Sequence, residues 1–240
     1  MRTEIKFCVL LNLLVEDIDA TVLSSILLFH VLQAEVRAAD LSDTYVSTMS
    51  TGPNDEALSL QVDLSEGVIF NGSAAPTTTD VSASNGVVHI IDEVMMPPNV
   101  VNFALNNSLF TSLVAALTRA DLTTDFVSIL SGDGPFTVFA PTDDAFTALL
   151  NTDDAWTTLA NIPIETLEAV LTYHVVSGSN VHADQLTDNQ TVSTLGGDLV
   201  TDLSDGARLE TTSGQSAKII LTDVQGSNGV VHAIDTVLLP

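Results

Sequence analysis

An internal repeat is the feature that most constrains how this chain can fold. The run Asn85–Asp92 recurs at Asn228–Asp235 with one difference in eight positions, at an offset of 143 residues. A second similarity, between Val22–Leu32 and Thr166–Val176, has an offset of 144 residues. Two separated matches at nearly the same offset indicate a duplicated module.

The repeat predicts one partial and one complete module. Each copy of the repeated run leads into a short apolar stretch closed by proline, at Pro97 and at Pro240. A complete module therefore corresponds to residues 98–240, whereas residues 1–97 lack about 46 residues on the N-terminal side. We predict a partial module over residues 1–97 and a complete module over residues 98–240.

The first residues permit two interpretations. Met1–Lys6 is weakly basic and Phe7–Val15 is apolar, which is typical of a short signal peptide. Glu16 and Asp17 follow without a small-residue cleavage site, however, and the apolar run Val22–Leu32 is needed as the main helix of its module. That run is also too short to span a bilayer. We favour a truncated start over a signal peptide.

The charge of the chain excludes several classes of partner. Its 240 residues include 31 acidic and 6 basic side chains, for a net charge of -25. So few basic residues cannot neutralise a phosphate backbone or an anionic membrane surface, so we expect no nucleic-acid partner. A single cysteine, Cys8, excludes an intrachain disulfide and a cysteine-based zinc site. The acidity itself fits a solvated surface, adaptation to high salt or a surface that collects cations.

Helical patterns precede strand patterns in the second module, which predicts an α+β fold. The apolar spacing predicts helices first, and short runs split by turn residues then predict strands. Phe136–Ala140 is expected as a buried strand stopped by Pro141, with Thr142 or Asp143 capping the next helix. The predicted helices are 107–117, 121–130, 143–150 and 164–176, and the later strands are 192–195, 199–203, 208–211, 218–221 and 230–238.

Three motifs of the second module resemble those of the fasciclin (FAS1) family. Phe136–Phe146 is similar to the first signature box of that domain, Asn228–Asp235 to its second box, and Tyr173-His174 to its central Tyr-His motif. Residues 13–97 resemble the later part of the same domain, with Phe29-His30 in place of Tyr-His. The resemblance implies a wedge-shaped β-sandwich with an α-helical lobe, in tandem, on secreted, periplasmic or cell-surface proteins that mediate adhesion. It implies no enzymatic activity and no cofactor.

The resemblance also suggests binding residues. The Tyr-His region has been implicated in integrin-type adhesion in the family, which gives Tyr173 with His174, and Phe29 with His30, a functional interpretation beside that of hydrogen-bonded core residues. An Asp-Ile pair of the adhesive animal members corresponds to two Asp-Val pairs here. An exposed carboxylate in them could complete the coordination of a partner's cation, or could be an ordinary loop aspartate. These pairs are Asp223 with Val224 and Asp80 with Val81.

The remaining histidines and acids carry no catalytic signature. His89 and His232 lie in apolar strand-like runs and are interpreted as structural, and His182 stands alone. No two histidines have the spacing of a metal site, and adjacent acids such as Asp143 and Asp144 do not converge on a helix. Hydrolase motifs are absent from the sequence, so we predict no enzyme and no metal site.

Three functional hypotheses follow from the sequence. The first is a non-enzymatic extracellular or cell-envelope protein that adheres to a surface receptor, a matrix polymer or a neighbouring cell. The second is a carrier of a small lipophilic molecule such as a carotenoid, held between helices and sheet. The third is self-association of the partial module through an exposed sheet edge, which predicts oligomers that dissociate when residues 1–97 are deleted.

Overall fold

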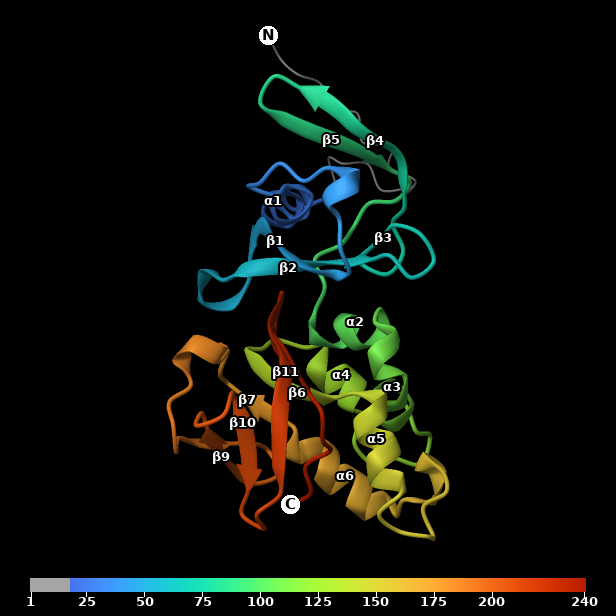
Figure 1. Ribbon diagram of the computed structural model, residues 1–240, viewed down its shortest axis with the longest axis vertical. Coiled ribbons are helices and arrows are strands. Elements are labelled where there is room, and N and C mark those ends of the chain that lie inside the picture. The colour runs from blue at the N-terminus through green and yellow to red at the C-terminus, as the bar shows by residue number, and fades with distance from the viewer. Residues whose placement is uncertain (1–17) are drawn as a thin grey trace. The chain divides into compact units, whose positions relative to one another are not determined.

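The computed structural model describes residues 18–240, which form two compact units (Figure 1). Unit 1 contains the described residues 18–51 and 55–97, and unit 2 contains residues 52–54 and 98–240. The interpretation of Met1–Lys6 and Phe7–Val15 concerns residues outside the described part of the chain.

Unit 2 is built on a seven-stranded sheet in the order β7-β6-β12-β11-β10-β9-β8. All neighbouring strands are antiparallel except β6 and β12, which pair in parallel. The strands are β6 (Phe136–Pro141), β7 (Val175–Ser177), β8 (Thr191–Ser193), β9 (Asp198–Asp202), β10 (Arg208–Thr211), β11 (Ser216–Gly226) and β12 (Gly229–Ile234).

The two signature boxes lie side by side in this sheet. Every residue of β6 and of β12 is buried, which fits strands covered on both faces. The two strands approach so closely that a Cβ atom on Gly229 would lie 2.2 Å from the carbonyl oxygen of Phe136. Glycine is therefore required at the start of β12, because any side chain would collide with the backbone of β6.

Helices α2, α3, α4 and α5 of unit 2 group on one side of its strands in Figure 1. Their starts follow from local capping: Asn99 forms a capping box with Asn102, and the Thr142 hydroxyl accepts a hydrogen bond from the backbone of Ala145. The α-helices are α2 (Val100–Leu105), α3 (Thr111–Leu117), α4 (Phe126–Leu130), α5 (Asp143–Leu150) and α6 (Ile164–Tyr173); the 3-10 helices are Ser108–Phe110, Leu159–Asn161 and Ala183–Gln185.

The described residues of unit 1 form one α-helix and two small sheets. Helix α1 begins after Asp19, whose carboxylate accepts the first free N–H groups, and its Phe29 is fully buried against Leu58 and Leu60. The elements are α1 (Ala20–Phe29), β1 (Thr44–Thr51), β2 (Ala57–Asp63), β3 (Ile69–Phe70), β4 (Pro76–Ala83), β5 (Gly86–Ile91) and the 3-10 helices Ala38–Asp40 and Pro53–Asp55. Strands β1, β2 and β3 form one sheet, and β4 and β5 form a separate two-stranded sheet.

The α+β prediction is confirmed, and the strand at Phe136 and the helix capped by Thr142 are found where the sequence places them. Several predicted boundaries were wrong. The strand expected over 230–238 is β12, which ends at Ile234, and the helix expected over Val22–Leu32 is α1, which ends at Phe29. The helix expected over 107–117 is divided into a 3-10 helix and α3. The helix expected over 164–176 ends at Tyr173, because Val175 pairs with Val138 and the carbonyl of His174 accepts the N–H of Phe139. The helix expected over 121–130 spans only α4, and the strand expected over 218–221 is part of the longer β11. Helix α2 was not predicted.

No helix within residues 18–240 has both the length and the apolar character needed to cross a bilayer.

Candidate functional site

A bulge in β11 fixes the position of Asp223. The pairing of β11 with β12 shifts register between Leu221 and Val224, and Asp223 has a φ of 60°. Aspartate is one of the few residues besides glycine that tolerate this left-handed conformation. Asp223 is therefore a strand residue at a bulge, and the interpretation as a loop aspartate was wrong.

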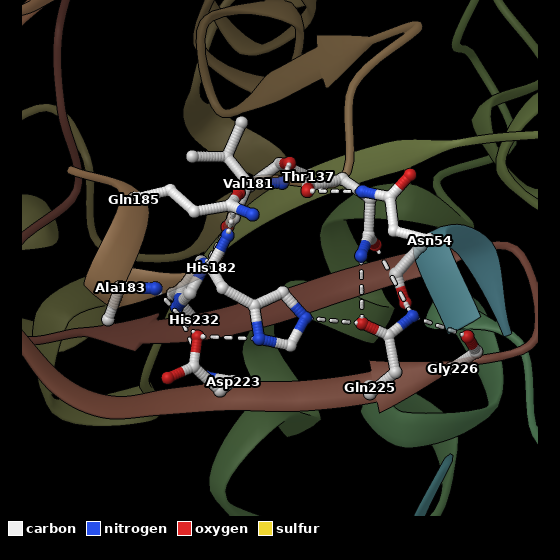
Figure 2. A network of polar contacts seen from close by, with 12 residues as sticks. Asn54, Thr137, Val181, His182, Ala183, Gln185, Asp223, Gln225, Gly226 and His232 are labelled. Carbon is white, nitrogen blue, oxygen red and sulfur yellow. Dashed lines mark hydrogen bonds and ion pairs between the residues drawn. The ribbon is translucent and has the colours of Figure 1, made fainter. Parts of the chain in front are cut away.

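The carboxylate of Asp223 is held on one oxygen and open on the other. Its Oδ1 accepts a hydrogen bond from the backbone N–H of Ala183 at 2.8 Å and lies 3.6 Å from Nδ1 of His182 (Figure 2). Oδ2 makes no hydrogen bond or ion pair to any described residue, and 34% of the side chain is exposed. The carboxylate thus has a fixed place and lone pairs left for a ligand.

Amide side chains orient His182 beside this carboxylate. Nε2 of His182 lies 2.7 Å from Oε1 of Gln225, and Nδ2 of Asn180 donates to the same oxygen at 3.0 Å. The Gln225 amide is held in turn, because its Nε2 donates to two backbone carbonyls at 2.8 and 3.1 Å. Since an amide oxygen can only accept, Nε2 of His182 carries a proton and Nδ1 faces Asp223.

His232 connects the backbone of Asp223 to the backbone of Val181, next to His182 (Figure 2). Its Nδ1 accepts the backbone N–H of Asp223 at 3.2 Å, and its Nε2 donates to the carbonyl of Val181 at 2.9 Å. The ring stacks on Phe139 with centroids 5.7 Å apart. Burial lowers the pKa of His232, so the imidazole is neutral and in one tautomer, and the structural interpretation of this residue is confirmed.

Unit 1 repeats the core of this arrangement. Asp80 has a φ of 57° at a register shift between β4 and β5, and its Oδ1 accepts the N–H of Ala38 at 3.0 Å. Nε2 of His89 lies 2.9 Å from the carbonyl of Val36. Aspartate and histidine thus make the same two backbone contacts in both units.

The two histidines of the central motif join the end of their helix to the segment that follows the hairpin of the same unit, through hydrogen bonds. In unit 2, Nδ1 of His174 donates to the carbonyl of Val170 at 2.7 Å, and Nε2 accepts the N–H of Leu238 at 3.1 Å. In unit 1, His30 makes the equivalent contacts with Ile26 at 2.7 Å and Met95 at 3.0 Å. Burial lowers the pKa of His174 to about 4, so this ring is neutral near pH 7.

The other predicted binding residues differ in exposure. Tyr173, Phe29 and Val224 are at most 2% exposed, and the Tyr173 hydroxyl donates to the carbonyl of Asp198 at 2.8 Å. Burial raises the pKa of this hydroxyl. Val81, in contrast, is 42% exposed. Of the eight predicted residues, Val81 is therefore exposed, and Asp223, Asp80 and His30 are half-buried.

Sequence reasoning missed the role of His182. The prediction that it stands alone was wrong, because the fold brings it against Gln225 and Asp223, about 40 residues later in the chain. The only available signal was the repeat, which aligns Ala183 and Ala38 at an offset of 145 residues. The Asp-Val pairs are offset by 143 residues, two fewer than the alanines. The sequence therefore did not show that the segment around His182 lies against Asp223.

Within residues 18–240, no cluster of three histidine, cysteine or acidic side chains could hold a metal ion. The adjacent acids behave differently from each other: Asp143 accepts hydrogen bonds from Thr111 and from the backbone of Ser112, while Asp144 lies in the first turn of α5. The hydrogen bonds lower the pKa of Asp143, although burial opposes them as the largest single effect.

The space between the helices and the sheet of unit 2 is small. A cavity of about 20 Å³ lies there, lined by apolar side chains that include Val101, Leu113 and Val231. This volume accommodates about one water molecule, whereas a drug-sized ligand needs roughly 300 Å³ or more. The unit in this conformation has no room for a carotenoid at that place.

Comparison with known proteins identifies the family. The family model of the fasciclin domain matches residues 10–97 and 108–240. The chain belongs to the fasciclin family. A fasciclin relative, protein sll1735 of Synechocystis sp. (strain PCC 6803), is 39% identical over 142 residues, which cover 59% of this chain and 98% of that protein.

More distant fasciclin proteins share part of the sequence or the fold. Human periostin is 31% identical over 160 residues, which cover 66% of this chain and 18% of periostin. A solved FAS1 domain pair from the insect cell adhesion molecule fasciclin I matches 90% of this chain and 79% of its own chain, with a TM-score of 0.59 and 20% identity. This structural similarity shows a shared fold.

Proposed function

We propose that this chain is a non-enzymatic binding protein of the cell surface, cell envelope or extracellular space, and that it acts in adhesion or attachment to a matrix. The observation that carries the proposal is the repeated bulge, which places Asp223 and Asp80 on paired strands. In each, Oδ1 accepts a backbone N–H and Oδ2 has no partner among the described residues. The solved FAS1 domain pair with a similar fold comes from fasciclin I, an insect cell adhesion molecule, and this supports a role in adhesion.

The open carboxylates are the proposed contact groups. Each is fixed through Oδ1 by a backbone N–H, so it needs little further ordering when a partner binds. Carboxylate oxygens coordinate hard cations and accept charge-assisted hydrogen bonds. The proposed partner is therefore a receptor or matrix polymer that presents a bound divalent cation or a guanidinium group.

The remaining predicted residues are proposed to act through these contact groups. Val81 adds an exposed apolar contact next to Asp80, and the buried Val224 anchors the bulge of Asp223. Tyr173 with His174, and Phe29 with His30, hold the core on which the hairpins rest. Substituting these core residues would weaken adhesion by disturbing the fold.

Cell attachment to the immobilised full chain tests the proposal. Integrin-bearing fibroblasts should attach in the presence of Mg²⁺ or Mn²⁺, and EDTA should release them. The Asp80→Asn, Asp223→Asn double variant keeps the amide oxygen that Ala183 and Ala38 contact but loses both charges, and we expect at least about tenfold weaker attachment. Asp205→Asn, on an exposed turn, is the matched control. Equal attachment of the double variant and the wild type would refute the proposed contact groups.

We also propose that unit 1 associates with another polypeptide through β5. Among the described residues, β5 pairs only with β4, so its second edge is open to a further strand. The sequence predicts a second copy of the chain as this partner.

A further inference from the structure

One edge of β5 differs from the corresponding edge in unit 2. Strand β12 is paired on both sides, with β11 and with β6, whereas β5 has only β4 beside it within residues 18–240. An isolated two-stranded sheet is marginally stable and gains from a third strand. Unit 2 therefore shows what kind of element the open edge of β5 accepts.

The hairpin of unit 1 exposes apolar side chains that are buried in unit 2. Val88 pairs with Val81 across the hairpin, and Ile90 lies two residues further along the same face. Their exposed fractions are 51% for Val88, 42% for Val81 and 51% for Ile90. The equivalent residues of unit 2 are only 1–4% exposed: Val224, Val231 and Ala233.

The first signature box accounts for much of this difference. In unit 2, Val138 and Ala140 of β6 lie opposite Val231 and Ala233, and α2 covers the same face through Val100. A three-residue strand, β7, pairs with the other edge of β6. The position equivalent to Val175 of β7 is Val31, which is 42% exposed, compared with 4% for Val175.

Two further residues of β5 lack the neighbour that β6 supplies. His232 stacks on Phe139 of β6, whereas no ring of the described residues stacks on the equivalent His89. A Cβ atom on Gly86 would meet nothing within 4 Å, although the equivalent Gly229 is required by contact with Phe136. Gly86 thus stands at a position of β5 where the described neighbouring residues would leave room for a side chain.

We propose that this face of unit 1 binds a first-box segment of the fasciclin type, supplied by another polypeptide, as a strand parallel to β5. The register follows from unit 2: Val87, Val88, His89 and Ile90 would lie opposite residues equivalent to Thr137, Val138, Phe139 and Ala140. The donated strand pairs with the backbone of β5, and its aromatic side chain covers the ring of His89.

A second copy of the chain fits this face less well. Its own first-box strand β6 lies between β7 and β12 and has no free edge. Pairing of β5 with β5 of a copy across a two-fold axis would be antiparallel and would bring together two chains of net charge -25. This inference deepens the proposed association through unit 1. It is independent of the contacts proposed for the carboxylates of Asp223 and Asp80, although the donated segment would cover Val81.

The probe is a peptide copying residues 98–142, which supplies α2 and β6, carried on a soluble fusion partner and added to the full chain. Binding is followed by fluorescence anisotropy and by amide hydrogen exchange of residues 86–91. The control peptide carries Phe139→Asp.

Two substitutions on the chain test the face itself. Gly86→Ala places a methyl group where the donated strand must pass, and Ile90→Asp puts a charge on the apolar face. The matched control is Ile220→Asp, at a side chain that is likewise 51% exposed but lies in unit 2.

We expect the peptide to bind and to slow exchange in residues 86–91. Gly86→Ala and Ile90→Asp should each weaken binding at least about tenfold, and Ile220→Asp should have no effect. The chain could instead form dimers that Ile90→Asp disrupts and that the peptide does not displace. That result would overturn the proposal in favour of a second copy of the chain. Absence of both binding and dimers would overturn the donated strand and the association through unit 1 together, while leaving the adhesion assay as a separate test.

Discussion

The hairpins β4–β5 and β11–β12 carry nearly the same sequence at the turn but lie in different surroundings. Both have an aspartate at a bulge and a histidine that contacts a backbone carbonyl about 50 residues earlier in the chain. Yet Val231 is 4% exposed and its equivalent Val88 is 51% exposed. The local sequence thus determines the bulge and the histidine contact, whereas burial depends on the strand and helices that pack against the hairpin.

Gly86, at the start of β5, and Gly229, at the start of β12, provide the test of this comparison with the largest expected effect. Gly229→Ala should destabilise unit 2 by roughly 3 kcal/mol or more, because the new methyl group would lie 2.2 Å from the carbonyl oxygen of Phe136. Gly86→Ala should change the stability of unit 1 by less than about 0.5 kcal/mol. Urea unfolding of both variants measures the difference, and equal effects would show that β5 is covered as β12 is.

Acidification should affect unit 2 through His174. Because the folded-state pKa of His174 is lowered to about 4 from 6.5, the unfolded chain binds this proton first as the pH falls. The associated stability is complete above pH 6.5 and is lost between pH 6.5 and 4, with a total of about 3 kcal/mol. Burial lowers the pKa of His232 as well, which acts in the same direction.

Unfolding at a series of pH values measures this loss. Aspartates with a lowered pKa, such as Asp143, begin to destabilise the fold only below their ordinary value of 3.8, outside this interval. His174→Gln should remove part of the slope between pH 6.5 and 4. A wild-type stability that stays constant over that interval would contradict a neutral buried ring.

Salt should stabilise both units. The net charge of -25 produces self-repulsion in the compact state, which dissolved ions screen. Relief of about 1 kcal/mol in molar NaCl would raise the melting temperature by roughly 2–4 °C for a chain of this size. KCl should act equally, because screening depends on ionic strength. An unchanged or lower melting temperature would count against adaptation to salt.

The two Asn-Gly turns should differ in chemical stability, with little effect on folding. Nδ2 of Asn228 donates to the carbonyls of Leu130 and Gly132 at 2.8 and 2.9 Å, whereas Asn85 is exposed. Deamidation requires the next backbone nitrogen to attack the side-chain carbonyl and expel ammonia, which a fixed amide resists. Peptide mapping of aged protein should find deamidation at Asn85 well before Asn228, and similar rates at both turns would contradict the difference in burial.

Features that depend on local sequence could be predicted. The repeat, the buried strand at Phe136 and the cap at Thr142 all rest on neighbouring residues, and the structure has them as expected. The end of α6 at Tyr173 could not be predicted, because it depends on pairing between Val175 and Val138. The same holds for the candidate site: the Asp-Val pair was visible in the sequence, but its contacts with Ala183 and His182 arise only in the fold.

Hydrogen exchange on the full chain tests most directly whether the two hairpins share one local structure and differ in the strand and helices that pack against them. The amides of β12 (Gly229–Ile234) should be strongly protected, because β12 is paired on both edges. The outward-facing amides of β5 (Gly86–Ile91) should exchange at least about 100-fold faster than those of β12. Equal protection of both strands would show that the edge of β5 is already occupied, and would contradict the difference from which the donated strand is inferred.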